Sequence, residues 1–178
     1  MTLCFYDCIL EVGIKMEFIK KLLHTKPRIA ILIDGPNILR KAFQLDLREV
    51  KNAVSVYGTI RIAKVYLDQY APEKLIEAMV NHGFDTEITT GDVDVTMAIE
   101  AMEYVLDPNI DIIALMTRDT DYRPVLVKAR AHGKKSMIIA TDVGFSAALK
   151  NTADIVILIP PKGTPEQLEK EVHETPGK

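Results

Sequence analysis

Residues 28–37 read RIAILIDGPN, a nearly continuous aliphatic run that ends in the four residues Asp-Gly-Pro-Asn. A short aliphatic run without alternation is typical of a central strand that is buried on both faces of a sheet. The Asp-Gly-Pro-Asn ending supplies turn-forming residues. The sequence therefore predicts a buried strand at residues 28–34, with Asp34 at its carboxyl end.

Outward from this stretch, strand patterns alternate with helical ones. Helical character follows the first strand to about residue 54, with a break at residues 44–46, and other helices are expected from Pro72, from about Val93, around residues 122–129 and at residues 146–150. Such alternation with short loops predicts a three-layer α/β/α fold with a central parallel sheet and right-handed crossovers. The further strands are expected at residues 58–67, 84–88, 110–116, 136–140 and 155–159.

Two of the expected helices carry apolar residues at helical spacing, and we expect these residues to face the sheet. In the helix that Pro72 opens they are Leu75, Ile76, Met79 and Val80. In the helix from about Val93 they are Val95, Ala98, Ile99, Met102 and Val105.

The 178 residues suit one domain with a real core. Hydrophobic residues make up 48% and charged residues 26%, which is ordinary for a soluble globular protein. The net charge of −3 excludes a strongly basic nucleic-acid binder, although a local phosphate-binding patch is compatible with it. We expect an extension with a short helix at residues 1–27, the domain at residues 28–160, and a polar tail at residues 161–178.

The first 27 residues contain both cysteines, Cys4 and Cys8. Two cysteines alone cannot complete a four-ligand zinc site, and no disulfide framework is present, so we expect a reducing cytoplasmic location. The apolar residues at the amino terminus are too few to span a membrane. Met16 begins a plausible amphipathic helix, and we expect translation to start there, which an intact mass of the native protein tests.

Acidic residues follow the predicted strands at several places. Asp34 ends the first strand, Asp94 lies at the start of a helix, and Asp119 and Asp121 follow the strand that ends at Met116. The carboxyl ends of parallel strands share one edge of a sheet, where ligands bind at the reversal of strand order. Carboxylates gathered there repel one another unless a cation lies among them, and oxygen ligands favour Mg²⁺ or Mn²⁺. We therefore predict a metal site from these four aspartates.

Each acid also has a plain structural interpretation. Asp34 could only form a turn, and Asp94 could only favour the positive end of a helix. One of Asp119 and Asp121 could cap the helix that follows. Asp92 is better interpreted as a helix N-cap than as a ligand, because this residue type is preferred at that position.

Other polar residues lie near the same predicted edge. Asn37 suits contact with a phosphate or a metal-bound water and, equally well, capping of the next helix. Arg118 and Arg123 are candidate phosphate-binding residues, because the guanidinium fork matches phosphate oxygens. Asp68 is expected to have a loop role, and Tyr70 offers a surface on which a base could stack.

The motifs IDGPN, GDVDVTMAIEAM, TRDTDY and ADIVILI resemble those of the NYN family of PIN-like nucleases, including LabA-like proteins, over residues 29–159. The family pattern is Asp-x-x-Asn after the first strand, Val-Asp-Val at a helix start, and Ser-Gly-Asp-Ser-Asp-Phe after the fourth strand. The pattern places Asp34, Asn37, Asp94, Asp119 and Asp121 at its polar positions. Arg118 departs from it, because the family usually has Gly there.

The resemblance implies the strand order 3-2-1-4-5 and a ribonuclease site in which the aspartates bind Mg²⁺ or Mn²⁺ and water is the nucleophile. It also implies RNA, single-stranded or structured, as the partner, and self-association into a homodimer. The leading hypothesis is thus a metal-dependent endoribonuclease, with Asp34, Asp94 and Asp119 as the principal ligands and Asp121 binding a second ion or orienting water.

Two other function classes stay open. One is an RNA-binding or regulatory module that keeps the acidic pocket without cleaving. The other is a small-molecule phosphatase, which is less favoured because no Gly-x-Ser-x-Gly elbow and no His partner for a Ser or Cys nucleophile is evident, although Asp34 could act as a nucleophile. A dinucleotide enzyme is weaker still, since no Gly-x-Gly-x-x-Gly motif follows the first strand.

Overall fold

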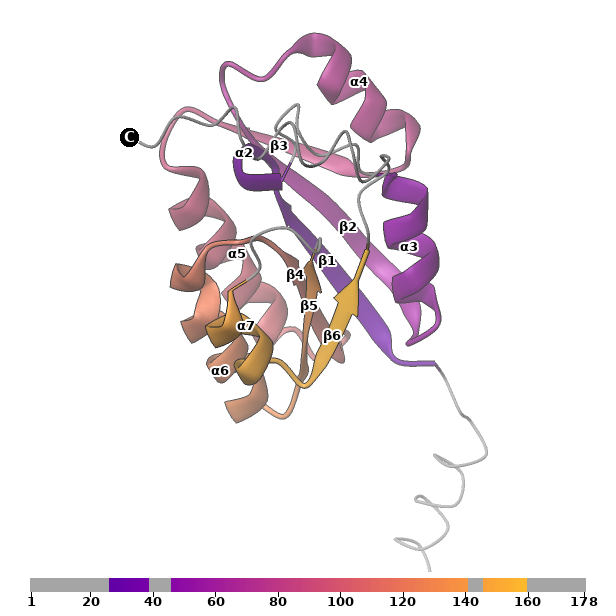
Figure 1. Ribbon diagram of the computed structural model, residues 1–178, viewed down its shortest axis with the longest axis vertical. Coiled ribbons are helices and arrows are strands. Elements are labelled where there is room, and N and C mark those ends of the chain that lie inside the picture. The colour runs from indigo at the N-terminus through magenta and orange to yellow at the C-terminus, as the bar shows by residue number, and fades with distance from the viewer. Residues whose placement is uncertain (1–25, 39–45, 141–145, 160–178) are drawn as a thin grey trace, which may run out of the picture.

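A computed structural model describes residues 26–38, 46–140 and 146–159, which form one parallel sheet flanked by helices (Figure 1). The strand order is β3-β2-β1-β4-β5-β6. The predicted three-layer α/β/α class and the order 3-2-1-4-5 are therefore confirmed, and β6 extends the sheet beyond β5. The expected extension before residue 26, the tail after residue 159 and part of the helix after the first strand lie outside the described residues.

The strands and helices alternate along the chain as the sequence patterns predict. The strands are β1 Arg28–Asp34, β2 Thr59–Asp68, β3 Asp85–Thr89, β4 Ile112–Met116, β5 Lys135–Ala140 and β6 Ile155–Leu158. The helices are α2 Gly35–Ile38, α3 Leu47–Ser55, α4 Glu73–Asn81, α5 Val93–Leu106, the 3-10 helix η1 Thr120–Tyr122, α6 Arg123–Ala131 and α7 Ala147–Thr152.

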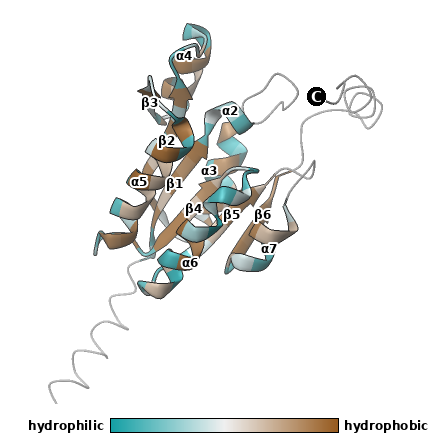
Figure 2. Cartoon of the chain, turned by 90° about the vertical axis from the view of Figure 1, so that its left-hand side faces the viewer, coloured by the Kyte–Doolittle hydropathy of each residue, from teal (hydrophilic) through white to brown (hydrophobic). Residues whose placement is uncertain are grey.

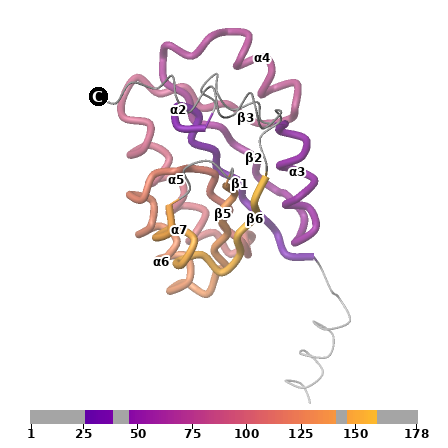
Figure 3. The backbone as a smooth tube through the Cα atoms, in the orientation of Figure 1, coloured from indigo at the N-terminus to yellow at the C-terminus, as the bar shows by residue number. Residues whose placement is uncertain are grey.

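The two faces of the sheet bury two separate cores, because successive residues of a strand point to opposite faces. Ile29, Ile31 and Ile33 of β1 pack with α3 and α4 on one face. Ala30 and Leu32 pack with α5, α6 and α7 on the other face. Figure 3 follows the chain through these layers, and Figure 2 shows hydrophobic colour concentrated on the strands between the helices.

A proline immediately precedes α4, and a glycine with a positive φ follows each of α4 and α6. Pro72 is the N-cap residue of α4, and Gly83, one residue beyond the cap His82, has a φ of 70°. Gly133 follows α6 in the same way with a φ of 73°. A positive φ of this size suits glycine, which carries no Cβ, so these glycines end their helices.

The apolar face predicted for α5 is wrong in part. Val95 and Ile99 are 55% and 60% exposed, whereas the residues turned to the sheet are Val93, Met97, Ala101 and Val105. Apolar residues lie on two faces of α5. The helical spacing of Val95 and Ile99 therefore led to the wrong choice of the face that packs on the sheet. Val80 of α4 was also predicted to face the sheet and is 56% exposed. Met79 of the same helix is buried, as predicted.

Strand β1 lies at the reversal of strand order, between β2 and β4. In the register, Asp34 pairs with Tyr66 of β2, and Ile33 pairs with Met116 of β4. The residues that follow β1 and β4 therefore emerge side by side at the carboxyl edge.

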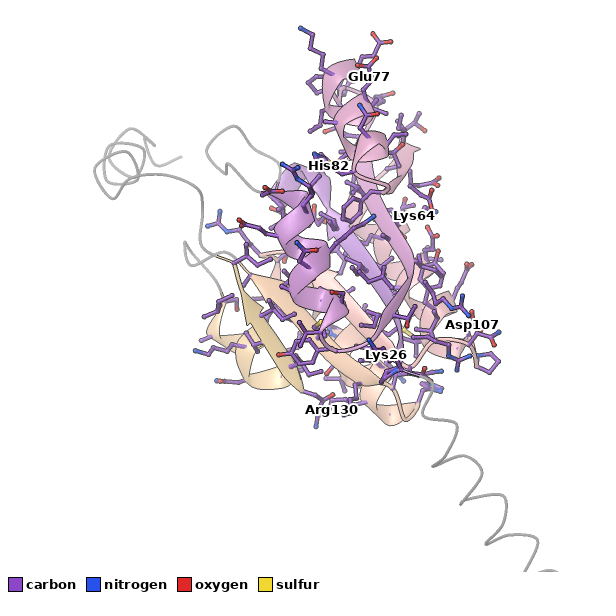
Figure 4. The ribbon with its side chains drawn as sticks, turned by 90° about the vertical axis from the view of Figure 1, so that its right-hand side faces the viewer. Lys26, Lys64, Glu77, His82, Asp107 and Arg130 are labelled. Carbon is purple, nitrogen blue, oxygen red and sulfur yellow. The ribbon has the colours of Figure 1, made fainter. Side chains whose placement is uncertain are left out.

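The opposite end of the molecule is marked by two labelled residues in Figure 4. Lys26, before β1, and Asp107, after α5, lie there, away from α4, on which Glu77 is labelled.

Candidate active site

Asp34 is the innermost residue of the predicted acidic cluster, with no exposed surface. Its Oδ2 accepts hydrogen bonds from Asn37 Nδ2 at 2.6 Å and from Thr117 Oγ1 at 2.9 Å. Its Oδ1 accepts one from the Asn37 backbone N–H at 3.2 Å. The carboxylate is therefore fixed in orientation at the end of β1, by one contact of the turn-forming kind and by two side-chain hydrogen bonds besides.

Thr117 connects Asp34 to the loop that carries the next acid. This residue follows β4 directly and has no exposed surface. While its hydroxyl donates to Asp34, the same oxygen accepts a hydrogen bond of 3.1 Å from the Asp119 backbone N–H. One buried hydroxyl thus sets the position of Asp34 relative to Asp119.

Asp119 and Asp121 lie on either side of the start of η1. Asp119 is the N-cap residue, and its Oδ1 accepts a hydrogen bond of 2.9 Å from the Asp121 backbone N–H. The capping role considered for one of the pair thus belongs to Asp119. Asp119 is half-buried beside Thr117, whereas Asp121 is exposed.

Asp94 joins the cluster from the first turn of α5. Its Oδ1 accepts a hydrogen bond of 2.9 Å from the hydroxyl of Tyr122, which is buried. Burial raises the pKa of Asp94, and the charges of Asp34, Asp119 and Asp92 raise it further, against the opposing effect of the Tyr122 hydroxyl. Asp94 therefore lies close enough to acids from the ends of β1 and β4 to experience their charge.

The carboxylates of Asp34, Asp94, Asp119 and Asp121 are ligands of the kind that a hard divalent cation prefers. As placed, no three of them are arranged to contact one ion. All are carboxylate oxygens, and the ion pairs formed among the described residues do not include Asp34, whose donors Asn37 and Thr117 are neutral. A buried carboxylate without a counter-charge is costly, which favours a cation nearby. In residues 26–38, 46–140 and 146–159, no three Asp, Glu, His or Cys side chains are placed to hold a metal ion together.

The other residues predicted near this edge differ in what they contact. Asn37 contacts Asp34 through both its side chain and its backbone, so it supports the acid and does not cap the next helix. Arg118 is half-buried between Thr117 and Asp119. Arg123 is exposed at the start of α6 and donates from Nε to Thr152 Oγ1 at 3.1 Å. Asp92 is the N-cap of α5, as the sequence indicated, and its side chain accepts a hydrogen bond from the Asp94 backbone N–H.

Sequence reasoning missed two contributors. Thr117 is the residue that stands where the family pattern has its first Ser, and a hydroxyl directly after a buried strand was the available signal. Tyr122 lies at the start of the helix expected around residues 122–129, where no role was assigned to its hydroxyl. Its ring is buried as expected, but its hydroxyl serves Asp94. No spacing rule links residues 94 and 122, so this contact was not accessible from the sequence.

Comparison with known proteins agrees with this geometry. The family model described as NYN domain matches residues 28–160. The chain belongs to the NYN domain family. This family is related to PIN-like nucleases, which generally use divalent metals.

One relative and one solved structure extend the comparison for this NYN domain protein. An uncharacterised protein of Methanocaldococcus jannaschii is 53% identical over 144 residues, which cover 81% of this chain and 59% of that protein. The chain thus spans well under two thirds of this relative. A crystal structure of a Vibrio parahaemolyticus protein of unknown function has a TM-score of 0.67 at 21% identity, covering 76% of this chain and 94% of that one, and it shows the shared fold.

The described helices were also compared with the length and hydropathy that a membrane span requires. None of those in residues 26–38, 46–140 and 146–159 is long and apolar enough to cross a bilayer.

Proposed function

We propose that this NYN domain is a metal-dependent ribonuclease that hydrolyses RNA phosphodiesters with a water molecule as the nucleophile. The observation that carries the proposal is the convergence of Asp34, Asp94 and Asp119 from three segments of the chain, with a raised pKa at Asp94. Acids gathered at the ligand-binding edge of an α/β sheet, one of them with a perturbed pKa, favour a catalytic site over a structural one. The match to the NYN family supports nuclease chemistry in particular.

Asp34, Asp94 and Asp119 would hold Mg²⁺ or Mn²⁺, partly through water, because few carboxylates are placed for direct contact. When bound, such a cation polarises a phosphoryl oxygen and lowers the pKa of an attacking water. Neighbouring side chains hold the three aspartates in position to bind the cation. Asn37 and Thr117 fix Asp34, Thr117 also positions the backbone at Asp119, and Tyr122 orients Asp94.

The remaining groups at this edge suit the substrate. Asp121 is exposed beside Asp119, where its carboxylate can orient a water molecule or a second ion. Arg123 uses Nε for Thr152, and a guanidinium has five N–H donors, so this bond holds the group while leaving donors for phosphate. Arg118, between the end of β4 and Asp119, adds positive charge on the path of an RNA backbone.

Cleavage of a labelled RNA tests the proposal. The purified protein should cut single-stranded RNA with Mn²⁺ and not with EDTA, and Asp94→Asn and Asp119→Asn should each lower the rate by about 100-fold or more, as loss of a group acting at the transition state does. Asp107→Asn is the matched control, because it makes the same change at the opposite end of α5 from Asp94. Equal rates for the wild type and Asp119→Asn would show that the assigned site is wrong.

A non-cleaving RNA-binding module is the second candidate. The open arrangement of the carboxylates and the presence of Arg118 in place of the family Gly favour it. Metal-dependent RNA binding without product, in protein free of contaminating nucleases, is the result that would establish this function over the first.

A further inference from the structure

A small hollow lies beside the acidic cluster, on the β2 side of Asp34. Its volume is about 180 Å³, and its walls come from the start of α2 and from the loop between β2 and α4. The apolar lining includes Pro36, Leu67, Pro72 and Leu75, and Tyr70 is part of its rim. The volume falls below the roughly 300–1,000 Å³ typical of a pocket for a whole small-molecule ligand. It suits a single ring system.

The hollow adjoins the proposed catalytic edge along the chain. Two of its lining residues, Gly35 and Pro36, directly follow Asp34 in the chain. Gly35 packs so closely on β2 that a Cβ there would lie 2.5 Å from the Tyr66 carbonyl oxygen and 2.5 Å from Leu67 Cδ2. The wall of the hollow and the backbone that carries Asp34 are therefore one rigid unit.

Tyr70 is presented on a constrained loop. Its backbone N–H donates to Asp68 Oδ1 at 2.8 Å, and the next N–H, of Ala71, donates to the Asp68 carbonyl oxygen at 3.1 Å. Pro72 then fixes the start of α4. On this loop the side chain of Tyr70 is 82% exposed, whereas Tyr66 and Tyr122 are buried. A large aromatic surface is thus held in water at the mouth of an apolar hollow.

The residues that line the hollow favour an uncharged, flat ligand over an anion. Among the described residues that line the hollow, Asp68 is the only charged one, so these walls disfavour an anion such as phosphate. A flat, uncharged ring gains from the apolar walls and from stacking on an aromatic side chain, which is how proteins bind unpaired bases. In a duplex both faces of a base are covered by its neighbours, so such a site accepts a base only from a single strand.

We propose that this hollow, with Tyr70 at its mouth, binds one unpaired nucleobase of an RNA strand whose adjacent phosphate lies at the aspartates. The identity of the ligand rests on the proposed ribonuclease function, which the subsite deepens by naming single-stranded RNA as the substrate. The base is held on the β2 side of Asp34, and the strand continues from there across Asp119 and Arg123.

The experiment measures binding apart from cleavage. A single-stranded RNA that contains 2-aminopurine is titrated in EDTA with the full chain and with Tyr70→Ala, Tyr70→Phe and Tyr57→Ala. Tyr57 is 41% exposed in the turn before β2, at the other edge of the sheet, and is the matched control. Thermal melts verify that each variant is folded, which is expected for substitutions of exposed side chains.

Stacking predicts that binding of the wild type quenches the fluorescence and that Tyr70→Ala loses the quenching and about 5- to 150-fold in affinity. Tyr70→Phe keeps both because the ring remains, and Tyr57→Ala matches the wild type. A duplex of the same sequence should bind the wild type and Tyr70→Ala equally. Wild-type affinity of Tyr70→Ala, an equal loss in Tyr57→Ala, or no binding of single-stranded RNA at all overturns the subsite.

The outcomes separate this subsite from the ribonuclease proposal. Quenching that depends on Tyr70, without cleavage in Mn²⁺, retains the subsite and rejects the nuclease. Cleavage that depends on Asp119, with wild-type binding by Tyr70→Ala, retains the nuclease and rejects the subsite.

Discussion

The hydroxyl of Tyr122 donates a hydrogen bond of 2.9 Å to Oδ1 of Asp94 and so joins the segment after β4 to the first turn of α5. Burial raises the pKa of Tyr122, and the charges of Asp34, Asp94 and Asp119 raise it further, so the hydroxyl stays protonated and serves as a donor. The pair therefore links acids that lie in distant parts of the sequence.

Tyr122→Phe removes the donor to Asp94 while keeping the buried ring. Because that hydrogen bond lowers the pKa of Asp94, its loss should raise this pKa further, and the acidic limb of the pH–rate profile should move to higher pH. Stability should fall by about 0.5–1.5 kcal/mol. Tyr104→Phe is the control, since it removes a hydroxyl from Glu100 on α5, away from the acids, and should leave the profile in place. An unmoved profile in Tyr122→Phe would argue against a role for Asp94 in its ionised form.

Thr117→Val replaces the buried hydroxyl with a methyl group of similar size. Asp34 then loses a donor and the Asp119 N–H loses its acceptor, both in a buried place, so unfolding should become easier by about 1–3 kcal/mol. Affinity for Mn²⁺ should fall as well, because the two acids lose their shared support. Thr117→Ser keeps the hydroxyl and should recover most of the metal affinity. Chemical denaturation and metal titration of both variants measure these effects.

Asp94→Asn should stabilise the metal-free protein at neutral pH. The folded-state pKa of Asp94 is raised, so its ionised form opposes folding increasingly as pH rises from the ordinary aspartate value through the raised one. Asn removes the charge and keeps an oxygen for the Tyr122 hydroxyl. Melting in EDTA at pH 7 should therefore give a Tm higher by roughly 1–4 °C, with the gap closing in acid. A lower Tm for Asp94→Asn at pH 7 would contradict the crowding of acids at this edge.

Asp111→Asn tests an ion pair at the amino edge, far from the site. The side-chain hydrogen bond from Arg28 Nε, at 2.9 Å, holds the pKa of Asp111 below its ordinary value. A lowered pKa contributes stability that is present above the ordinary aspartate value and is lost as pH falls through the lowered one. The variant should lose about 0.5–1 kcal/mol at pH 7, because water screens a carboxylate that is 43% exposed. Denaturation midpoints should begin to converge with those of the wild type as pH falls below about 4, whereas a constant gap would rule out the charge as the cause.

Gly35→Ala tests the close approach that seats Asp34. The added Cβ would lie 2.5 Å from the Tyr66 carbonyl oxygen, which belongs to the central sheet and cannot move freely. We expect a loss of about 1–3 kcal/mol from overpacking and a matching displacement of α2, which carries Asn37. Gly91→Ala is the control, since its Cβ would meet no atom nearer than Thr89 Oγ1 at 3.6 Å. Equal stability of the two variants, by chemical denaturation, would show that the contact is relaxed in solution.

Most of the fold could be predicted from the sequence, because buried parallel strands produce unbroken aliphatic runs. The run that ends at Asp34 and the one that ends at Met116 are β1 and β4, and they lie side by side as the strand order required. The face of α5 was predicted wrongly because Val95 and Ile99 repeat at the same helical spacing as the buried residues. Periodicity reports that a helix has an apolar face, and a second apolar face makes that signal ambiguous.

The candidate site could be predicted only as a set of acids at one edge. Asp34, Asp94 and Asp119 come together because each follows or precedes a strand end, which the pattern of strands determines. Their support could not be predicted in the same way. The bond between Tyr122 and Asp94 depends on how α5 and η1 pack in three dimensions, and Thr117 acts through atoms that no spacing rule relates to residue 34.

Titration of the metal-free protein with Mn²⁺, followed by calorimetry or by the electron paramagnetic resonance of the ion, tests the central claim most directly, because it needs neither RNA nor turnover. The wild type should bind Mn²⁺, Asp94→Asn and Asp119→Asn should each weaken the Kd by at least about 10-fold, and Asp107→Asn should bind like the wild type. Binding that is the same in all four proteins, or absent from the wild type, would contradict a metal site at the carboxyl edge.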